Sequence, residues 1–258
     1  MAISSFSLVP ESVGCYVFHS NGGAMVQATL YIGTKNASSW AMRAWLALKA
    51  SGYEFDEELV DIRRPQRFFN LARIGRLAPP ASVPVLDTGR TVVYDSLAIM
   101  EFANDVSGGK LLPADIEARA EARALAAWQH AGLSAICRRI SFESAFYPFK
   151  RALSAAEQEQ GGKLFAHYEA LLNRYGGPFL FGSISLADFM HVPTVLRLLR
   201  HDLDLENSPN AREWAKRLLD RPSVREWIDE ADRLPHIWYD DYLEGATWPV
   251  RVQGDSRA

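Results

Sequence analysis

The chain has 258 residues, 48% of them hydrophobic and 23% charged, which is typical of a globular protein with one or two domains. Its net charge of −3, without a long basic run, argues against nucleic acid or an anionic membrane as a main partner. No apolar run approaches the roughly 20 residues that span a bilayer. Cys15 and Cys137 form no paired motif, which indicates a reducing compartment.

The beginning of the chain carries no clear structural pattern. Residues 1–27 contain no Lys or Arg and no compact apolar core, so they do not resemble a secretory signal. The pair Gly22-Gly23 interrupts them further. We therefore expect a poorly ordered tail over residues 1–27, with Met25 as an alternative start of the native protein.

The first strong pattern covers residues 30–52 and predicts a strand, a polar loop and a helix. The apolar residues 30–32 favour a buried strand, and Gly52 occupies the position of a glycine that ends a helix. Ser38 lies just before the first helical turn. Its hydroxyl has two alternative roles: it caps the helix, or it donates a hydrogen bond to an anion held at the helix N-terminus.

The next segment predicts a second strand, a short helix, a hairpin and another helix. The expected ranges are strand 54–60, helix 66–72, strands 82–87 and 91–94, and helix 97–106. Pro84 stands near the start of its strand, where a proline is tolerated.

After Ser107 no segment reads convincingly as a strand. Residues 113–140 favour a helix, with Leu125 and Trp128 on one apolar stripe. Residues 154–157 and 185–188 both match the capping-box pattern that begins a helix. We expect an all-helical second half that loses its periodicity past residue 242.

Four short motifs resemble those of the cytosolic glutathione S-transferases. The run Ser38-Ser39-Trp40-Ala41-Met42-Arg43 is similar to the Ser/Cys-x-x-x-x-Arg that opens the first helix of that family, in a Ser-Ser-Trp form that suggests a bacterial subgroup. Val83-Pro84 resembles the strand whose proline is cis, and Asp95-Ser96 resembles the acidic-Ser pair that opens the third helix. Residues 182–188 resemble the buried capping box of the second domain.

The resemblance implies a thioredoxin-like α/β domain over residues 28–107 and an all-α domain over residues 112–243, with residues 244–258 as a tail. It also implies a cytoplasmic homodimer whose co-substrate is glutathione. No histidine stands at a metal-like spacing from another, so we expect no metal.

The resemblance implies a binding residue for every part of glutathione except its glycine end. Ser38 would donate a hydrogen bond to the thiolate, with Ser39 and then Asn36 as weaker alternatives. Val83, before a cis Pro84, would pair its backbone with the cysteinyl part. Ser96 would bind the γ-glutamyl carboxylate and Asp95 the amino group. Residues 71–82 depart from the family pattern, so no residue is assigned to the glycine end.

A pocket for an electrophile is expected between Ser38 and the first long helix of the second half. Its candidate walls are aromatic, namely Trp128, Phe142, Phe146 and Tyr147. His130 is either a general acid or a structural residue, and Arg138-Arg139 is either a solvated face or a cationic part of the pocket. We expect Arg43 to be structural, and Ser185 and Asp188 to form a helix cap.

Three functions remain open at this point. The first is a glutathione transferase, with a role in detoxification, in which the thiolate attacks a small hydrophobic electrophile. The second is a glutathione-dependent isomerase of the maleylacetoacetate type. The third is a catalytically silent binding module on the same fold.

Overall fold

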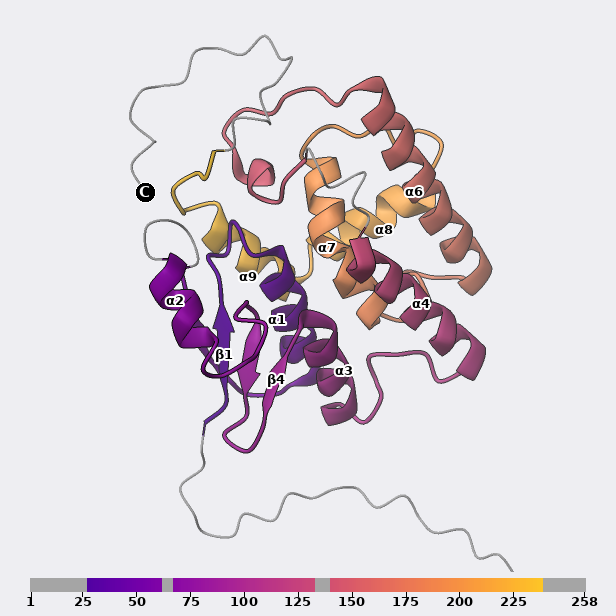
Figure 1. The fold of residues 1–258 in the computed structure, drawn as a ribbon. Helices are drawn as coiled ribbons and strands as arrows, with labels where there is room; N and C mark the ends of the chain where they lie inside the picture. The colour runs from indigo at the N-terminus through magenta and orange to yellow at the C-terminus, as the bar shows by residue number, and fades with distance from the viewer. Residues whose placement is uncertain (1–26, 62–66, 133–139, 239–258) are drawn as a thin grey trace, which may run out of the picture.

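A computed structural model describes residues 27–61, 67–132 and 140–238 of the chain. The tails expected at residues 1–27 and 244–258 therefore lie almost entirely outside the described residues, as do Cys15, Cys137 and the pair Arg138-Arg139. The described chain consists of an α/β part followed by an all-α part, which is the expected architecture (Figure 1). None of the described helices is long and apolar enough to cross a membrane.

A four-stranded mixed sheet forms the centre of the α/β part. Its strands are β1 (Thr29–Ile32), β2 (Asp56–Leu59), β3 (Val85–Asp87) and β4 (Val92–Tyr94), in the order β2-β1-β3-β4. Leu30 pairs in parallel with Glu57 of β2 and antiparallel with Leu86 of β3. The parallel pair needs a long crossover connection, and a helix supplies it.

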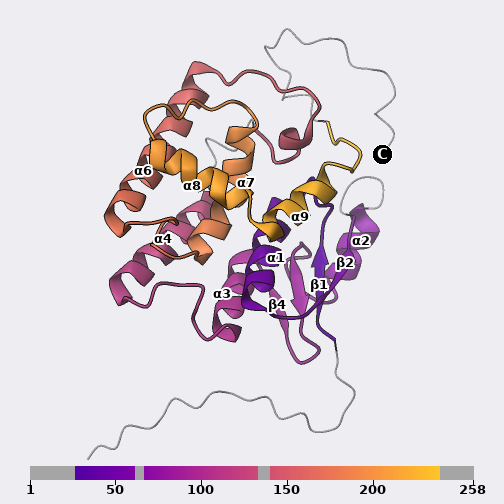
Figure 2. The same cartoon turned by 180° about the vertical axis from the view of Figure 1, so that it is seen from behind.

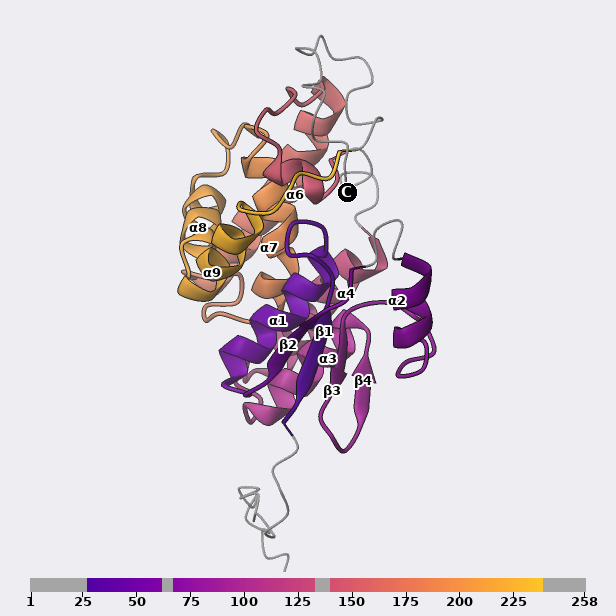
Figure 3. The same cartoon turned by 90° about the vertical axis from the view of Figure 1, so that its left-hand side faces the viewer.

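Three helices cover the two faces of the sheet. Helices α1 (Ser39–Ser51) and α3 (Ser96–Val106) lie on one face, and α2 (Arg67–Ile74) lies on the other (Figure 3). Every residue from position 41 to position 48 of α1 is buried, because α7 and α9 of the all-α part also pack against this helix. Gly52 ends α1 in the left-handed conformation, as predicted.

In the all-α part, the other helices surround a central helix, α7 (Leu186–Leu199) (Figure 2). All residues of α7 up to Leu198 are buried. The other elements are α4 (Ile116–Gly132), the 3-10 helix η1 (Glu143–Phe146), α6 (Ala155–Tyr175), α8 (Pro209–Leu219) and α9 (Pro222–Ala231). Within the described residues, no strand after Tyr94 joins the sheet.

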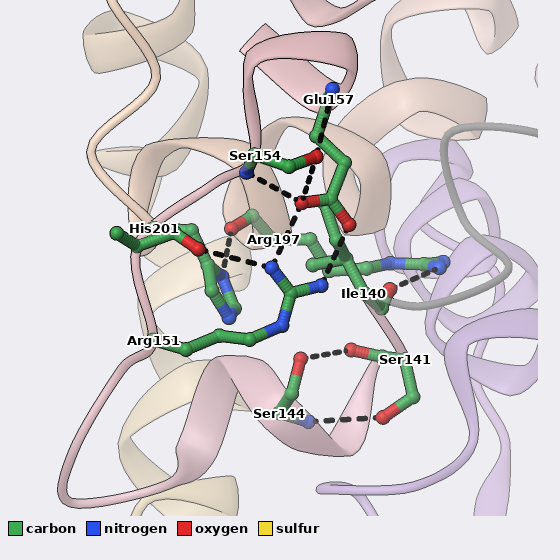
Figure 4. Close-up of polar contacts among 9 residues, drawn as sticks. Ile140, Ser141, Ser144, Arg151, Ser154, Glu157, Arg197 and His201 are labelled. Atoms are coloured by element: carbon green, nitrogen blue, oxygen red, sulfur yellow. Dashed lines mark hydrogen bonds and ion pairs between the residues drawn. The ribbon is translucent and has the colours of Figure 1, made fainter. Parts of the chain in front are cut away.

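Both predicted capping boxes are present. The Ser154 hydroxyl accepts a hydrogen bond from the Glu157 backbone N–H at 3.3 Å, and the Glu157 carboxylate accepts one from the Ser154 N–H at 2.8 Å (Figure 4). Asp188 reaches back in the same way to the Ser185 backbone N–H at 2.8 Å. The second carboxylate oxygen of Asp188 accepts from Trp214 Nε1 at 2.9 Å, so this buried group is a structural cap.

The predicted apolar stripe of α4 is wrong at Trp128, whose side chain is 47% exposed. The buried face of α4 consists instead of Ala118, Ala122, Leu125, Ala126 and Gln129. Their mostly small side chains let α4 approach α7 closely, and Thr194 of α7 donates a hydrogen bond to Gln129 at 2.9 Å. Close helix packing therefore favours alanine on this face, and the large indole remains at the surface.

Candidate functional site

The loop between β1 and α1 places the Ser38 hydroxyl at the N-terminus of α1. The Thr34 carbonyl accepts hydrogen bonds from the backbone N–H groups of Ala37 and Ser38, at 2.9 and 2.8 Å, and these close the loop. The Ser38 carbonyl accepts the first helical bond from Met42 at 3.1 Å. The Ser38 side chain makes no capping hydrogen bond. The capping role is therefore not the one observed, and the hydroxyl lies where a helix N-terminus favours an anion.

Gly33 brings Ser38 next to the segment that enters β3. A Cβ built on Gly33 would lie 3.0 Å from Ser38 Cβ and 3.5 Å from Val83 Cγ2. The absence of a side chain at Gly33 thus leaves the space into which Ser38 packs, with Val83 next to the same position. The Val83–Pro84 peptide bond is cis, as the resemblance implies.

The N-terminus of α3 carries the second pair of candidate residues. One carboxylate oxygen of Asp95 accepts hydrogen bonds from the backbone N–H groups of Leu97 and Ala98, at 2.8 and 3.3 Å. Asp95 has a φ of 77°, which is uncommon for a residue with a side chain. Ser96 is the first helical residue and is buried. Such strained positions cluster at ligand sites, so this helix start is a candidate anion site.

His130 of α4 connects the two helix starts. Its Nε2 lies 3.1 Å from the second carboxylate oxygen of Asp95. Its ring meets the Trp40 ring edge-on at a centroid distance of 5.2 Å. The guanidinium of Arg43 lies 4.2 Å from the centre of the Trp40 ring and donates to the Met190 carbonyl at 2.7 Å. Sequence reasoning gave His130 no partner, because nothing local marks a contact between residues 35 positions apart.

A buried cation holds the β1–α1 loop from the other side. Lys35 Nζ lies 2.9 Å from Glu57 and 2.8 Å from Glu230. Its ammonium also lies 5.3 Å from the centre of the Trp45 ring and 5.2 Å from that of Trp227. Burial lowers the pKa of Lys35, but the hydrogen bonds to Glu230 and Glu57 outweigh it and leave the pKa raised. Lys35 therefore stays charged and fixes the loop that carries Ser38.

Comparisons with known proteins agree with this geometry. The family model of the glutathione S-transferase N-terminal domain matches residues 37–106, and that of the C-terminal domain matches residues 139–231. A maleylpyruvate isomerase from Ralstonia sp. is 32% identical over 190 residues, which cover 71% of this chain and 88% of that protein. The chain belongs to the glutathione S-transferase family.

Other known proteins are similar to most of the chain. A probable maleylacetoacetate isomerase from Caenorhabditis elegans is 27% identical over 204 residues, which cover 75% of this chain and 89% of that protein. A glutathione transferase homologue from Burkholderia, whose structure contains bound glutathione, is 26% identical with a TM-score of 0.59. That match covers 80% of this chain and 98% of the other chain.

Two aromatic candidates for the pocket wall lie deep in the all-α part of this family member. Phe142 and Phe146 are buried and pack edge-on at 5.2 Å. The guanidinium of Arg197 lies 5.8 Å from the Phe142 ring, and that of Arg200 lies 5.1 Å from the Phe146 ring. Arg197 also donates to the Ile140 carbonyl at 3.3 Å (Figure 4). Cations thus stand beside these rings.

Tyr147 fixes the segment that follows α9. Its hydroxyl donates to the Ile237 carbonyl at 2.7 Å, and its ring stacks on Trp238 at 4.2 Å. Asn36 of the β1–α1 loop donates to the Pro235 carbonyl at 2.8 Å. The amide of Asn36 is therefore used to hold this segment, which disfavours its alternative role as a thiolate donor.

The structure does not bring Trp128 together with the rest of the site. Its ring meets His167 of α6 edge-on at 6.2 Å. His130, two residues later on the same helix, contacts Asp95 and Trp40 on the other side. Residues at positions i and i+2 of a helix do not share a face, which explains the separation. Among the described residues, no group of three His, Cys, Asp or Glu side chains could hold a metal ion.

Proposed function

We propose that this protein is a glutathione-dependent enzyme that activates the thiol of glutathione for attack on a small electrophile, as a glutathione transferase does. The observation that carries the proposal is the Ser38 hydroxyl, which makes no capping bond at the N-terminus of α1 and lies beside Val83. The sequence, the family membership and this geometry all support the same position for the thiol.

The energy that Ser38 has to supply is modest. A free thiol has a pKa near 8.5, so only a few per cent is thiolate at neutral pH. Lowering that pKa by about two units requires roughly 2.7 kcal/mol of preference for the anion. A hydrogen bond to a charged group contributes about 1.5–3 kcal/mol, and the helix N-terminus adds to it. Ser38 therefore stabilises the thiolate by donating a hydrogen bond, without acting as a nucleophile.

The other candidate residues fit the remaining parts of glutathione. The Val83 backbone, just before β3, offers an edge for the cysteinyl part. Ser96 at the N-terminus of α3 offers its hydroxyl and backbone N–H to the γ-glutamyl carboxylate. The second carboxylate oxygen of Asp95 offers an acceptor to the γ-glutamyl amino group. In a transfer reaction, the sulfur forms a bond to the electrophilic carbon while the leaving group departs with its electron pair.

A glutathione-dependent isomerase is the second candidate. Two of the similar proteins are named as isomerases of the unsaturated acids maleylacetoacetate and maleylpyruvate. Acidic substrates need cations nearby, and Arg197 stands beside Phe142. Arg200 stands beside Phe146, but its guanidinium is already paired with the Asp232 carboxylate at 2.7 Å. In this reaction the sulfur adds to one carbon of the double bond, the resulting single bond rotates, and expulsion of the same sulfur restores the double bond in its other geometry.

Two measurements on the purified protein test the proposal. Calorimetry measures glutathione binding, and a substrate panel then covers an aryl halide, an epoxide, an enone, a hydroperoxide and maleylpyruvate. Conjugation that consumes glutathione supports the transferase, and conversion of maleylpyruvate without loss of glutathione supports the isomerase. Binding with no turnover of any substrate would indicate the silent binding module. Absence of glutathione binding would overturn the proposal.

We also propose that the enzyme is a cytoplasmic homodimer, as its family membership suggests. The two widely spaced cysteines agree with a reducing compartment. Light scattering at micromolar concentration should report twice the 28.9 kDa of one chain. A species of 28.9 kDa alone would contradict the dimer.

A further inference from the structure

We propose that His130 is a positioning residue that holds the Asp95 carboxylate in place for the amino group of the γ-glutamyl end of glutathione. This inference rests on the proposed function, because it requires glutathione at the N-terminus of α3. Helix α4 of the all-α part would then help to recognise the γ-glutamyl group.

The two oxygens of Asp95 have different partners. Oδ1 accepts hydrogen bonds from the backbone N–H groups of Leu97 and Ala98, and so it caps the helix. Oδ2 points to His130 Nε2 at 3.1 Å. A carboxylate oxygen has room for two donors, so Oδ2 accepts His130 and a ligand ammonium together. His130 thereby fixes the rotation of the carboxylate that presents Oδ2 to the ligand.

His130 is itself held in a defined orientation. Its ring meets Trp40 at an interplanar angle of 73°, and the Arg43 guanidinium lies over that indole. Because Nε2 faces a carboxylate, Nε2 carries the proton that it donates to Asp95. The other nitrogen, Nδ1, is buried without a hydrogen-bond partner among the described residues. Nε2 is used by Asp95 and Nδ1 is buried, so His130 acts on the ligand through the Asp95 carboxylate.

The geometry distinguishes this role from a purely structural one. Asp95 would meet the γ-glutamyl amino group, whereas Ser96, Val83 and Ser38 would meet other parts of glutathione. Loss of His130 should therefore weaken the recognition of one chemical group and leave the others unchanged. A histidine that only supported the fold would affect every part of the ligand alike.

The test compares glutathione with glutaryl-cysteinylglycine, which is glutathione without its α-amino group. Calorimetry measures the Kd of both ligands for the wild type, His130→Leu and His130→Gln. We expect His130→Leu to raise the Kd of glutathione about three- to tenfold and to leave the Kd of the glutaryl compound unchanged. His130→Gln keeps an N–H donor and should recover most of the loss.

His167→Leu is the matched control, because His167 also meets an indole edge-on in the all-α part, whereas the histidine that pairs with Asp95 in the described chain is His130. It should leave both Kd values unchanged. Equal weakening of both ligands by His130→Leu, or unchanged affinity for glutathione, would overturn the inference while the proposed function stands. A wild type that binds neither ligand would overturn both.

Discussion

At the scale of single residues, the site depends on a missing side chain. A methyl group on Gly33 would crowd the Ser38 side chain, whereas it would meet Val83 at an ordinary contact distance of 3.5 Å. In Gly33→Ala the new Cβ would lie 3.0 Å from Ser38 Cβ and 3.2 Å from Ser38 Oγ. We expect this crowding to shift the hydroxyl, to lower kcat/KM about tenfold and to cost about 1–3 kcal/mol of the free energy of unfolding.

Gly162→Ala provides the control for that substitution. A Cβ on Gly162 in α6 would meet nothing within 4 Å. Alanine is a better helix former than glycine, so this variant should keep full activity and gain up to about 1 kcal/mol of stability. Steady-state kinetics and urea unfolding of both variants give the comparison. Full activity of Gly33→Ala would show that the close approach at Gly33 is not required.

At the scale of elements, the start of α6 depends on one charged cap. The Glu157 carboxylate accepts hydrogen bonds from the Arg151 guanidinium at 2.6 and 2.8 Å and from the Ser154 backbone N–H (Figure 4). The hydrogen bond from Arg151, partly opposed by burial and aided by Ser154, lowers the pKa of Glu157 from 4.5 to about 2. A carboxylate with a lowered pKa contributes its full stability above its ordinary pKa and loses it as the pH falls towards the lowered value.

Glu157→Gln should therefore cost about 1–2 kcal/mol at pH 7, after allowance for solvent screening of this half-buried pair. The difference from the wild type should shrink as the pH falls from 4.5 to about 2. Urea unfolding at several pH values measures it. Glu159→Gln, which removes an exposed pair with Lys163 on the same helix, should change stability little at any pH. A pH-independent loss in Glu157→Gln would contradict the ion-pair explanation.

Elements whose signals are local could be predicted from the sequence. Gly52 ends α1, and the capping boxes at Ser154 and Ser185 begin α6 and α7, because each pattern is complete within a few residues. The contacts of Lys35 could not be predicted in this way, since Glu230 is 195 positions away. The expected face of Trp128 was wrong because periodicity does not tell which side of α4 packs on α7.

At the scale of the whole molecule, Lys35 ties the β1–α1 loop to both β2 and α9. Trp227 Nε1 donates to the Lys35 carbonyl at 2.9 Å, so the backbone and the side chain are held together. Lys35→Met would leave the carboxylates of Glu57 and Glu230 facing each other without a cation. We expect a loss of about 1–3 kcal/mol in the free energy of unfolding, together with lower turnover because the loop carries Ser38.

The double variant Lys35→Met with Glu230→Gln tests the cause of that loss. Removal of one carboxylate relieves the repulsion, so the double variant should be more stable than Lys35→Met alone. Urea unfolding of the wild type, the two single variants and the double variant gives the coupling energy. Strict additivity would show that the ion pair with Glu230 does not contribute to the stability that Lys35 provides.

The central claim is that Ser38 stabilises the thiolate of bound glutathione. The most direct measurement is the pKa of the bound thiol, followed by the ultraviolet absorbance of the thiolate in wild type, Ser38→Ala and Ser39→Ala. Loss of a hydrogen bond worth about 1.5–3 kcal/mol should raise this pKa by about one to two units in Ser38→Ala, with much less change in Ser39→Ala. Turnover of Ser38→Ala should then recover at high pH. An unchanged pKa in Ser38→Ala, or the larger increase in Ser39→Ala, would contradict the assignment of Ser38.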